Sequence, residues 1–180
     1  YTHYLNFKKA LFMGNLAGKT ALVVGGGTGI GLGIAVALAR EGCHVVIAGR
    51  RNEVLSQAAA TFTGQPAIGY HAVDVGDPQS VQQLVDWTLK ELGHIDIFVN
   101  SAGVNVVQRK MAELSIADWD MMLQINASGA FYCLRSILPH MRERKDGLIV
   151  NVSSIAGKRA SLLGGVGYSA AKFAMTALGM

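Results

Sequence analysis

The chain has 180 residues, 51% of them hydrophobic and 16% charged, which fits a single globular domain and excludes a disordered chain. Its formal net charge is +4, but the basic residues lie in small scattered groups and form no stripe interleaved with aromatic residues, so we expect no nucleic-acid partner. The longest apolar runs are too short to span a bilayer, so we expect no membrane partner.

Runs rich in Val and Ile alternate with helical patterns after an N-terminal extension, residues 1–17. The apolar runs predict strands at 20–24, 44–48, 67–73, 95–100 and 147–152. The intervening patterns predict helices at 30–41, 52–62, 78–92 and 116–141. Near-continuous apolar strands between helices are typical of the α/β class and predict a doubly wound parallel sheet, or Rossmann fold, in residues 18–180.

Two predicted helix starts have capping side chains. Asp77 can accept an N–H of the first turn, and Pro78 occupies a position that needs no donor. Ser115-Ile-Ala-Asp118 resembles a capping box in which Asp replaces Glu.

The C-terminal end of the predicted sheet has an unpaired side. The fifth strand, 147–152, has no later strand to pair with, and the last helix runs to Met180 without a following turn. A bare apolar edge favours aggregation. We therefore expect either C-terminal strands that this chain lacks or another chain that covers the edge.

A glycine-rich turn, Gly25-Gly-Gly-Thr-Gly29-Ile-Gly31, directly follows the first predicted strand and opens a helix. Glycine permits a tight turn and lets backbone N–H groups approach a pyrophosphate at the positive end of the helix. Such turns also serve plain strand-to-helix packing, but the strand before and the helix after are the context that dinucleotide binding requires. The residues predicted to contact a cofactor here are Gly25, Gly27, Thr28, Gly29, Ile30 and Gly31.

The end of the second strand indicates which dinucleotide is preferred. A carboxylate there normally bonds the ribose 2′-hydroxyl of NAD, whereas an arginine accommodates the 2′-phosphate of NADP. No carboxylate lies between Glu41 and Glu53, and Arg50 and Arg51 follow the strand. Two guanidinium groups suit phosphate, so we predict NADP as the cofactor, with NAD less favoured and Arg50 as the main contact. The alternative is a solvated helix start.

Tyr168 and Lys172 lie four residues apart in a helical pattern, which places a phenol and an ammonium on one face. A fixed cation beside a phenol stabilises the phenolate and makes the phenol a better proton donor. Taken alone, the pair is also compatible with a lysine stem that lies along a ring at the surface.

Together these motifs resemble those of the short-chain dehydrogenase/reductase family, from about Lys19 to the end of the chain. Six motifs stand in the family's order: the glycine loop, Asp74-Val75, Asn100-Ser-Ala-Gly103, Asn126, Ser154 and Tyr168-x-x-x-Lys172.

The resemblance implies cofactor contacts after the third and fourth strands. Asp74, beside Val75, would bond the adenine amino group, although it could simply cap a turn. Asn100, Ala102 and Gly103 would line the cofactor cleft.

The resemblance also implies a catalytic set. Tyr168 would be the general acid and base, Ser154 would hold the substrate oxygen, and Lys172 would keep Tyr168 reactive and hold the nicotinamide ribose. Asn126 would anchor a water that links Lys172 to solvent, although it could instead satisfy buried backbone. Ser153 is left as backbone support.

Three departures from the family pattern stand out. Val24 precedes the glycine loop where threonine is usual, and Ser101 follows Asn100 where a second asparagine is usual. The family's two side chains bond each other, and apolar packing by Val24 would replace a hydrogen bond worth only about 1 kcal/mol net. The segment from Ser154 to Tyr168 is one residue longer than expected.

These residues predict an oxidoreductase that transfers a hydride between NADP(H) and a small-molecule carbonyl or secondary alcohol. The alternative is a catalytically silent NADP-binding regulatory protein on the same fold. We expect a homodimer or homotetramer. Five apolar residues are candidates for the substrate pocket: Val104, Val106, Val107, Leu162 and Leu163.

Cysteine and histidine usage bears on location and metal binding. Cys43 and Cys133 offer neither a disulfide framework nor a metal-binding pair, and the five histidines have no ligand spacing. We therefore expect a reducing, cytoplasmic location and no metal.

Overall fold

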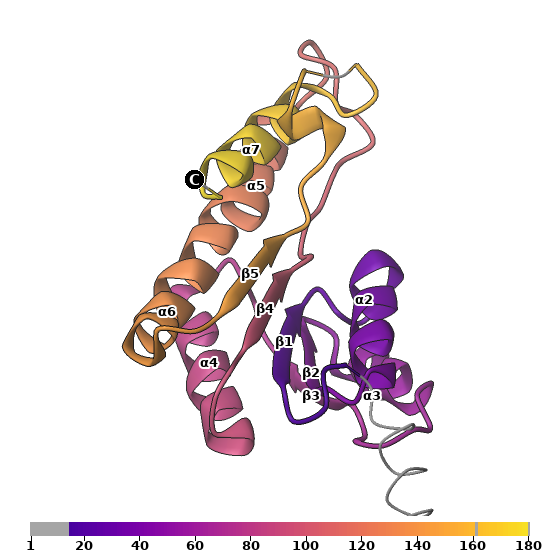
Figure 1. The fold of residues 1–180 in the computed structure, drawn as a ribbon. Helices are drawn as coiled ribbons and strands as arrows, with labels where there is room; N and C mark the ends of the chain where they lie inside the picture. Colours follow the sequence, from indigo (N-terminus) through magenta and orange to yellow (C-terminus); the bar gives the residue numbers. More distant parts are fainter. Residues whose placement is uncertain (1–14, 161, 180) are drawn as a thin grey trace, which may run out of the picture.

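Five short strands form one parallel sheet in this computed structural model, which describes residues 15–160 and 162–179. The strands are β1 (Thr20–Val24), β2 (His44–Gly49), β3 (Gly69–Ala72), β4 (Ile97–Asn100) and β5 (Leu148–Asn151). Their order across the sheet is β3-β2-β1-β4-β5 (Figure 1). The chain therefore extends the sheet first to one side of β1 and then to the other, which leaves a crevice at the carboxyl ends of β1 and β4. The predicted doubly wound parallel sheet is confirmed.

Helices cover both faces of the sheet (Figure 1). The helical elements are α2 (Gly29–Arg40), α3 (Asn52–Ala60), α4 (Pro78–Leu92), α5 (Ile116–Leu123), η1 (Gln124–Ser128), α6 (Gly129–Arg144), η2 (Ile155–Gly157) and α7 (Val166–Ala177). Helices α2 and α3 cover one face, and α4 and α6 cover the other. Helix α7 packs against α5 and η2.

Both faces of the central strands are buried, which explains their near-continuous apolar sequence. Leu22 and Val24 of β1 point into the core under α4 and α6, whereas Ala21 and Val23 point into the core under α2 and α3. All four side chains are at most 1% exposed. Hydrophobic burial on two faces therefore stabilises β1 as the centre of the sheet.

The predicted single helix at 116–141 is divided. Helix α5 leads into a π-helical turn, η1, which is followed by α6, and α6 ends at Arg144 rather than 141. Asn126 lies in η1 and is fully buried. Its side chain bonds the backbone of Val104, so a tertiary contact accompanies the irregular turn; the 3.6-residue periodicity carries no signal for it.

The capping predictions are confirmed with one difference. The side chain of Asp77 accepts the N–H of Gln79 at 2.9 Å, and Ser115 Oγ accepts the N–H of Asp118 at 3.0 Å. The Asp118 carboxylate bonds the Ser115 hydroxyl at 2.8 Å rather than a backbone N–H.

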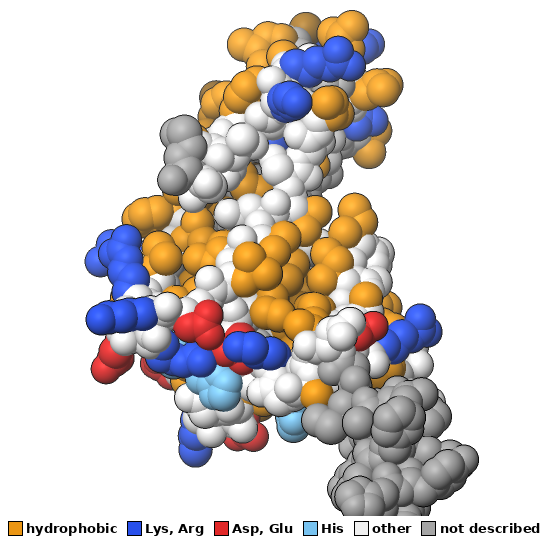
Figure 2. Space-filling model, in the orientation of Figure 1, with side chains coloured by type: hydrophobic (Ala, Val, Ile, Leu, Met, Phe, Trp, Pro, Cys, Tyr) orange, Lys and Arg blue, Asp and Glu red, His pale blue; other side chains and the backbone are white. Residues whose placement is uncertain are grey.

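Strand β5 is an edge of the described sheet, as the sequence predicts. It pairs with β4, and its Leu148 and Val150 side chains are 55% and 38% exposed. Figure 2 shows hydrophobic side chains across the middle of this view of the molecule.

Residues 1–14, which make up most of the predicted N-terminal extension, lie outside the described residues. Within 15–160 and 162–179, no helix combines the length and hydropathy that a membrane crossing requires.

A buried carboxylate joins the sheet to α6 at the amino end of the strands. Asp96 is 4% exposed and accepts hydrogen bonds from the Thr20 backbone N–H and from Arg144 Nη2, each at 2.9 Å. His94 Nε2 and Lys19 Nζ lie 3.1 and 3.5 Å from its oxygens. Burial by itself raises the pKa of Asp96, but these bonds and charges outweigh burial and lower the pKa to about 2.

We expect Asp96→Asn to lower the free energy of unfolding by about 2 kcal/mol, which corresponds to the pKa lowered from 3.8 to about 2. Because the folded-state pKa is depressed, this stabilisation is present above about pH 4 and is lost as pH falls toward about 2. Denaturant unfolding at a series of pH values measures both effects. Asp120→Asn, at an exposed position, is the control, and equal stability of the two variants would contradict the assignment.

Candidate active site

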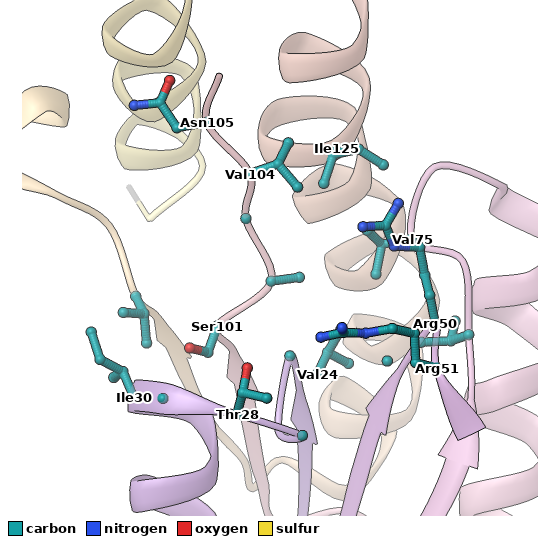
Figure 3. Close-up of a pocket in the computed structure, with 18 of the residues that line it drawn as sticks. Val24, Thr28, Ile30, Arg50, Arg51, Val75, Ser101, Val104, Asn105 and Ile125 are labelled. Atoms are coloured by element: carbon teal, nitrogen blue, oxygen red, sulfur yellow. The ribbon is translucent and has the colours of Figure 1, made fainter. Parts of the chain in front are cut away.

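An open cavity of about 450 Å³ lies at the carboxyl ends of the strands, in the crevice that the strand order predicts. Segments that follow all five strands contribute to its wall, together with η1 and α7 (Figure 3). Among the residues predicted from the sequence, the wall includes Gly25, Gly27, Thr28, Gly29, Ile30, Arg50, Arg51, Val75, Ala102, Gly103, Tyr168 and Lys172.

The glycine loop approaches the loop after β4 at backbone distance. Gly25 has φ of +78°, and a Cβ atom built on it would lie 2.6 Å from the backbone of Ser101 and Ala102. Only glycine fits this position without displacing the neighbouring chain. Val24 before it is 1% exposed, and its carbonyl accepts the Ser101 N–H at 2.8 Å.

The positive end of α2 opens toward this cavity. Thr28 is the residue before the helix and makes no side-chain capping bond, and the first turn contains no acidic residue. Thr28, Gly29 and Ile30 line the cavity. Unpaired N–H groups at the N-terminus of a helix bind anions, so this end of the cavity suits a phosphate group.

Arg50 and Arg51 lie on the opposite wall, where β2 leads into α3 (Figure 3). Both are exposed, and neither forms an ion pair with a carboxylate in the part of the chain that the structure describes. The charged residues of the cavity wall are these two arginines and Lys172. The cavity is therefore suited to an anionic ligand.

Tyr168 and Lys172 both line the cavity from α7, as their spacing predicts. Lys172 Nζ lies 5.8 Å from the centre of the Tyr168 ring. Lys172 is 3% exposed, and its ammonium donates to the Val152 carbonyl at 3.0 Å and to Met175 Sδ at 3.4 Å. Burial lowers the pKa of Lys172. The Tyr168 hydroxyl has no hydrogen-bond partner among the described residues, so its proton is available to a ligand.

The two neighbouring serines have different hydrogen-bond partners. Thr176 donates its hydroxyl hydrogen to the Lys172 carbonyl at 2.9 Å, so Ser153 is the donor in its 2.9 Å bond to Thr176. Ser154 Oγ accepts the Ala156 N–H at 3.1 Å, and its own hydrogen has no acceptor among the described residues. Ser153 is part of the cavity wall and Ser154 is not.

Several predicted site residues do not reach the wall. The exposed Asp74 accepts the Gly76 N–H at 2.9 Å, so it caps a turn in this structure. Asn100 is 2% exposed and accepts the Ala102 N–H at 3.3 Å, which braces the loop from below. Asn126 accepts the Val104 N–H at 2.8 Å and donates to the Val104 carbonyl at 2.9 Å. Gly31 lies one residue beyond the wall, within α2.

The predicted apolar substrate pocket does not form as one surface. Val104 lies on the cavity wall, whereas Val107 and Leu163 are 90% and 86% exposed. Leu162 lines a separate apolar groove beside Phe173.

Wall residues that sequence reasoning missed are mostly apolar. They include Val54, Leu55, Val73, Ile125, Val152 and Asn105. Val73 and Ile125 each precede a residue that the sequence did single out, Asp74 and Asn126. For Val73 and Ile125, the position next to a motif residue could have indicated a place on the cavity wall. Val54 and Leu55 have no such signal, because they look like ordinary core residues of a helix.

Thiol and metal chemistry have no support in the described residues. Burial raises the pKa of Cys43 to about 11 and that of Cys133 to about 12, so both thiols are poor nucleophiles. No three His, Cys, Asp or Glu side chains gather to hold a metal ion within 15–160 and 162–179.

Comparison with known proteins identifies the family. The model of the short chain dehydrogenase family matches residues 19–180. An uncharacterized oxidoreductase of Staphylococcus aureus (strain MW2) is 35% identical over 160 residues, which cover 89% of this chain and 68% of the relative. Another from Staphylococcus saprophyticus is 34% identical over 169 residues, which cover 91% of this chain and 70% of that protein.

Solved structures agree with this result. The crystal structure of levodione reductase has 31% sequence identity and a TM-score of 0.87, and the match covers 91% of this chain. The chain spans 64% of the length of levodione reductase. The chain therefore belongs to the short-chain dehydrogenase/reductase family, a family of oxidoreductases that use nicotinamide cofactors.

We expect Gly25→Ala to lower the free energy of unfolding by at least about 2 kcal/mol, because the methyl group adds both strain at positive φ and overlap with backbone. Gly33→Ala is the matched control within α2. A Cβ there meets nothing within 4 Å, and alanine should raise the free energy of unfolding by about 0.5–1 kcal/mol. Denaturant unfolding measures both, and a neutral Gly25→Ala would contradict the close approach.

Proposed function

We propose that this chain carries the hydride-transfer site of an NADP-dependent oxidoreductase that interconverts a carbonyl group and a secondary alcohol. The observation that carries the proposal is a Tyr168 hydroxyl without a partner among the described residues, beside the buried ammonium of Lys172, in a cavity whose charged wall residues are all cationic. The cationic residues would bind the phosphate groups of the cofactor, and the Tyr168 hydroxyl would bind the oxygen of the substrate in the same cavity.

The residues present fit a phosphorylated dinucleotide. At Gly29, the first residue of α2, a Cβ atom would meet nothing within 4 Å, and no acidic residue in the first turn opposes a phosphate. Arg50 and Arg51 would hold the 2′-phosphate that distinguishes NADP from NAD. We therefore favour NADP over NAD. Ala102 and Gly103 would line the cleft, and Asp74 would accept the adenine amino group with Oδ2, because Oδ1 accepts the Gly76 N–H.

When bound, the nicotinamide would supply a hydride to a carbonyl carbon or accept one from an alcohol. Tyr168 would donate a proton to the carbonyl oxygen in reduction and take it back in oxidation. Lys172 would stabilise the phenolate, because its ammonium is buried and lies on the same face of α7. Ser154 would donate its uncommitted hydroxyl hydrogen to the substrate oxygen.

Asn126 has a different part in the proposal. Both ends of its amide bind Val104, so it holds the loop after β4 in place. A water linking Lys172 to solvent would bind at the second N–H or lone pair of this amide, or at the backbone of η1. We propose this water as the proton relay.

We also propose that the whole protein is a homodimer or homotetramer and is cytoplasmic. Helices α5 and α7 lie side by side and expose Ile116 at 80%, Met121 at 36% and Phe173 at 44%, which suits pairing of subunits. Both cysteines are free, as expected in a reducing compartment.

The first test is Tyr168→Phe in the full-length natural protein, screened for NADPH oxidation with ketones, sugars and acyl thioesters. We expect kcat to fall by at least about 10²-fold while NADPH binding is retained, because the ring stays and only the acid is lost. Tyr70→Phe, on the exposed edge strand β3, is the control. Near-normal turnover by Tyr168→Phe would exclude the mechanism, and a wild-type protein that binds NADPH without any turnover would favour a regulatory role.

The second test is Arg50→Ala. We expect the Kd of NADPH to rise about ten- to a hundredfold and that of NADH to change less than about twofold, since only the 2′-phosphate contact is removed. Fluorescence titration of both nucleotides gives the ratio. Arg142→Ala, on the exposed side of α6, controls for net charge. An unchanged NADPH to NADH ratio in Arg50→Ala would refute the assignment of NADP.

A further inference from the structure

Two loops meet at the end of the cavity that lies away from Arg50 and Arg51. One is the first part, residues 101–110, of the loop between β4 and α5, and the other is residues 162–165, which lead into α7. Asn105 belongs to the first loop and lies on the cavity wall beside α7 (Figure 3). Its Nδ2 donates to the carbonyl of Gly164 at 3.1 Å.

Backbone contacts accompany this side-chain bond. The Val166 N–H, at the first residue of α7, donates to the Arg109 carbonyl at 3.4 Å. Gly165 has φ of +79°, and a Cβ built on it would lie 2.6 Å from the Arg109 carbonyl oxygen. The start of α7 is therefore in direct contact with the loop after β4.

Both ends of the Asn105 amide make hydrogen bonds within the protein. Its Oδ1 accepts the Val106 N–H at 2.8 Å, while its Nδ2 is engaged by Gly164. The side chain therefore shapes its own loop with one end and ties that loop to the second one with the other. This pattern indicates a role in positioning the two loops.

The bond between Asn105 and Gly164 affects the position of Tyr168, the proposed proton donor. Helix α7 begins without a side-chain cap, and Tyr168 is two residues after its first residue. The preceding loop contains Gly164 and Gly165, and glycine has more backbone freedom than other residues, so contacts with the loop after β4 help to fix the helix start. The loop after β4 is held from below by Asn126, which binds Val104. Asn105 thus links the loop after β4, which Asn126 holds in place, to the start of the helix that carries Tyr168.

We propose that Asn105 is a positioning residue, which clasps the loop after β4 to Gly164 and thereby sets the position of Tyr168 relative to the cavity. The catalytic consequence rests on the proposed function, whereas the clasp itself does not.

The first arm of the test is hydrogen exchange of the full-length natural protein, read by mass spectrometry. Asn105→Ala should raise exchange about two- to tenfold in peptides covering both 104–110 and 162–168, since one hydrogen bond between them is lost. Peptides from β1 and α2 should not change. Gln108→Ala, an exposed amide in the same loop with no bond among the described residues, is the matched control.

The variant Asn105→Asp distinguishes the effects of the two hydrogen bonds that the amide makes. The carboxylate can still accept the Val106 N–H but cannot donate to Gly164, so it should behave like Asn105→Ala. Wild-type exchange in Asn105→Asp would show that only the turn at Val106 matters and would overturn the clasp. Exchange at 162–168 that is equal in Asn105→Ala and Gln108→Ala would overturn it as well.

The second arm measures turnover with NADPH and phenanthrenequinone. Asn105→Ala should lower kcat about tenfold with an unchanged Kd for NADPH, because a small displacement of a reacting group slows chemistry strongly. The primary isotope effect with deuterated NADPH should rise, since the chemical step becomes more limiting; a mere loss of folded protein would leave it unchanged. Unchanged kcat and isotope effect would overturn the positioning role.

The two arms separate the two ideas. If the wild-type protein reduces no carbonyl compound in the screen, the proposed function fails, and the exchange measurements still decide whether the clasp exists.

Discussion

The close approach between the turn after β1 and the loop after β4 is the constraint on which the site depends. Strands β1 and β4 are parallel neighbours with Val24 opposite Asn100, so both chains leave the sheet at the same level. Gly25 then touches the backbone of Ser101 and Ala102. This contact places the N-terminus of α2 beside the loop that carries Gly103 and Val104. The segments that follow β1 and β4 therefore line one cavity.

The two ends of the sheet use charge differently. At the amino end, Asp96 is surrounded by Arg144, His94 and Lys19, so charges are paired within the protein. At the carboxyl end, the cavity wall has cationic side chains and no carboxylate. Removing one partner of a buried ion pair destabilises the fold, whereas cations without a carboxylate partner in a crevice attract an anionic ligand. Stability and binding therefore rest on electrostatic groups at opposite ends of the strands.

Much of the fold could be predicted, because strand and helix periodicities are local properties. Strand β1 and helix α4 have the predicted boundaries, and Arg50, Arg51, Tyr168 and Lys172 all reach the cavity. The predictions fell short where a side chain meets a distant segment. The split of the helix at η1 accompanies the bond from Asn126 to Val104, which lies 22 residues away in sequence. No local periodicity reports such a contact.

The sequence by itself determined the fold class, the glycine turn and the pairing of Tyr168 with Lys172, because each follows from the spacing of residues within one element. Only the tertiary structure decided the state of each polar group, because hydrogen bonds join segments far apart in the chain. In the folded chain the Ser153 hydroxyl bonds Thr176, whereas the hydroxyl hydrogens of Ser154 and Tyr168 have no acceptors among the described residues. The tertiary structure also brings Asn105 to Gly164, 59 residues away.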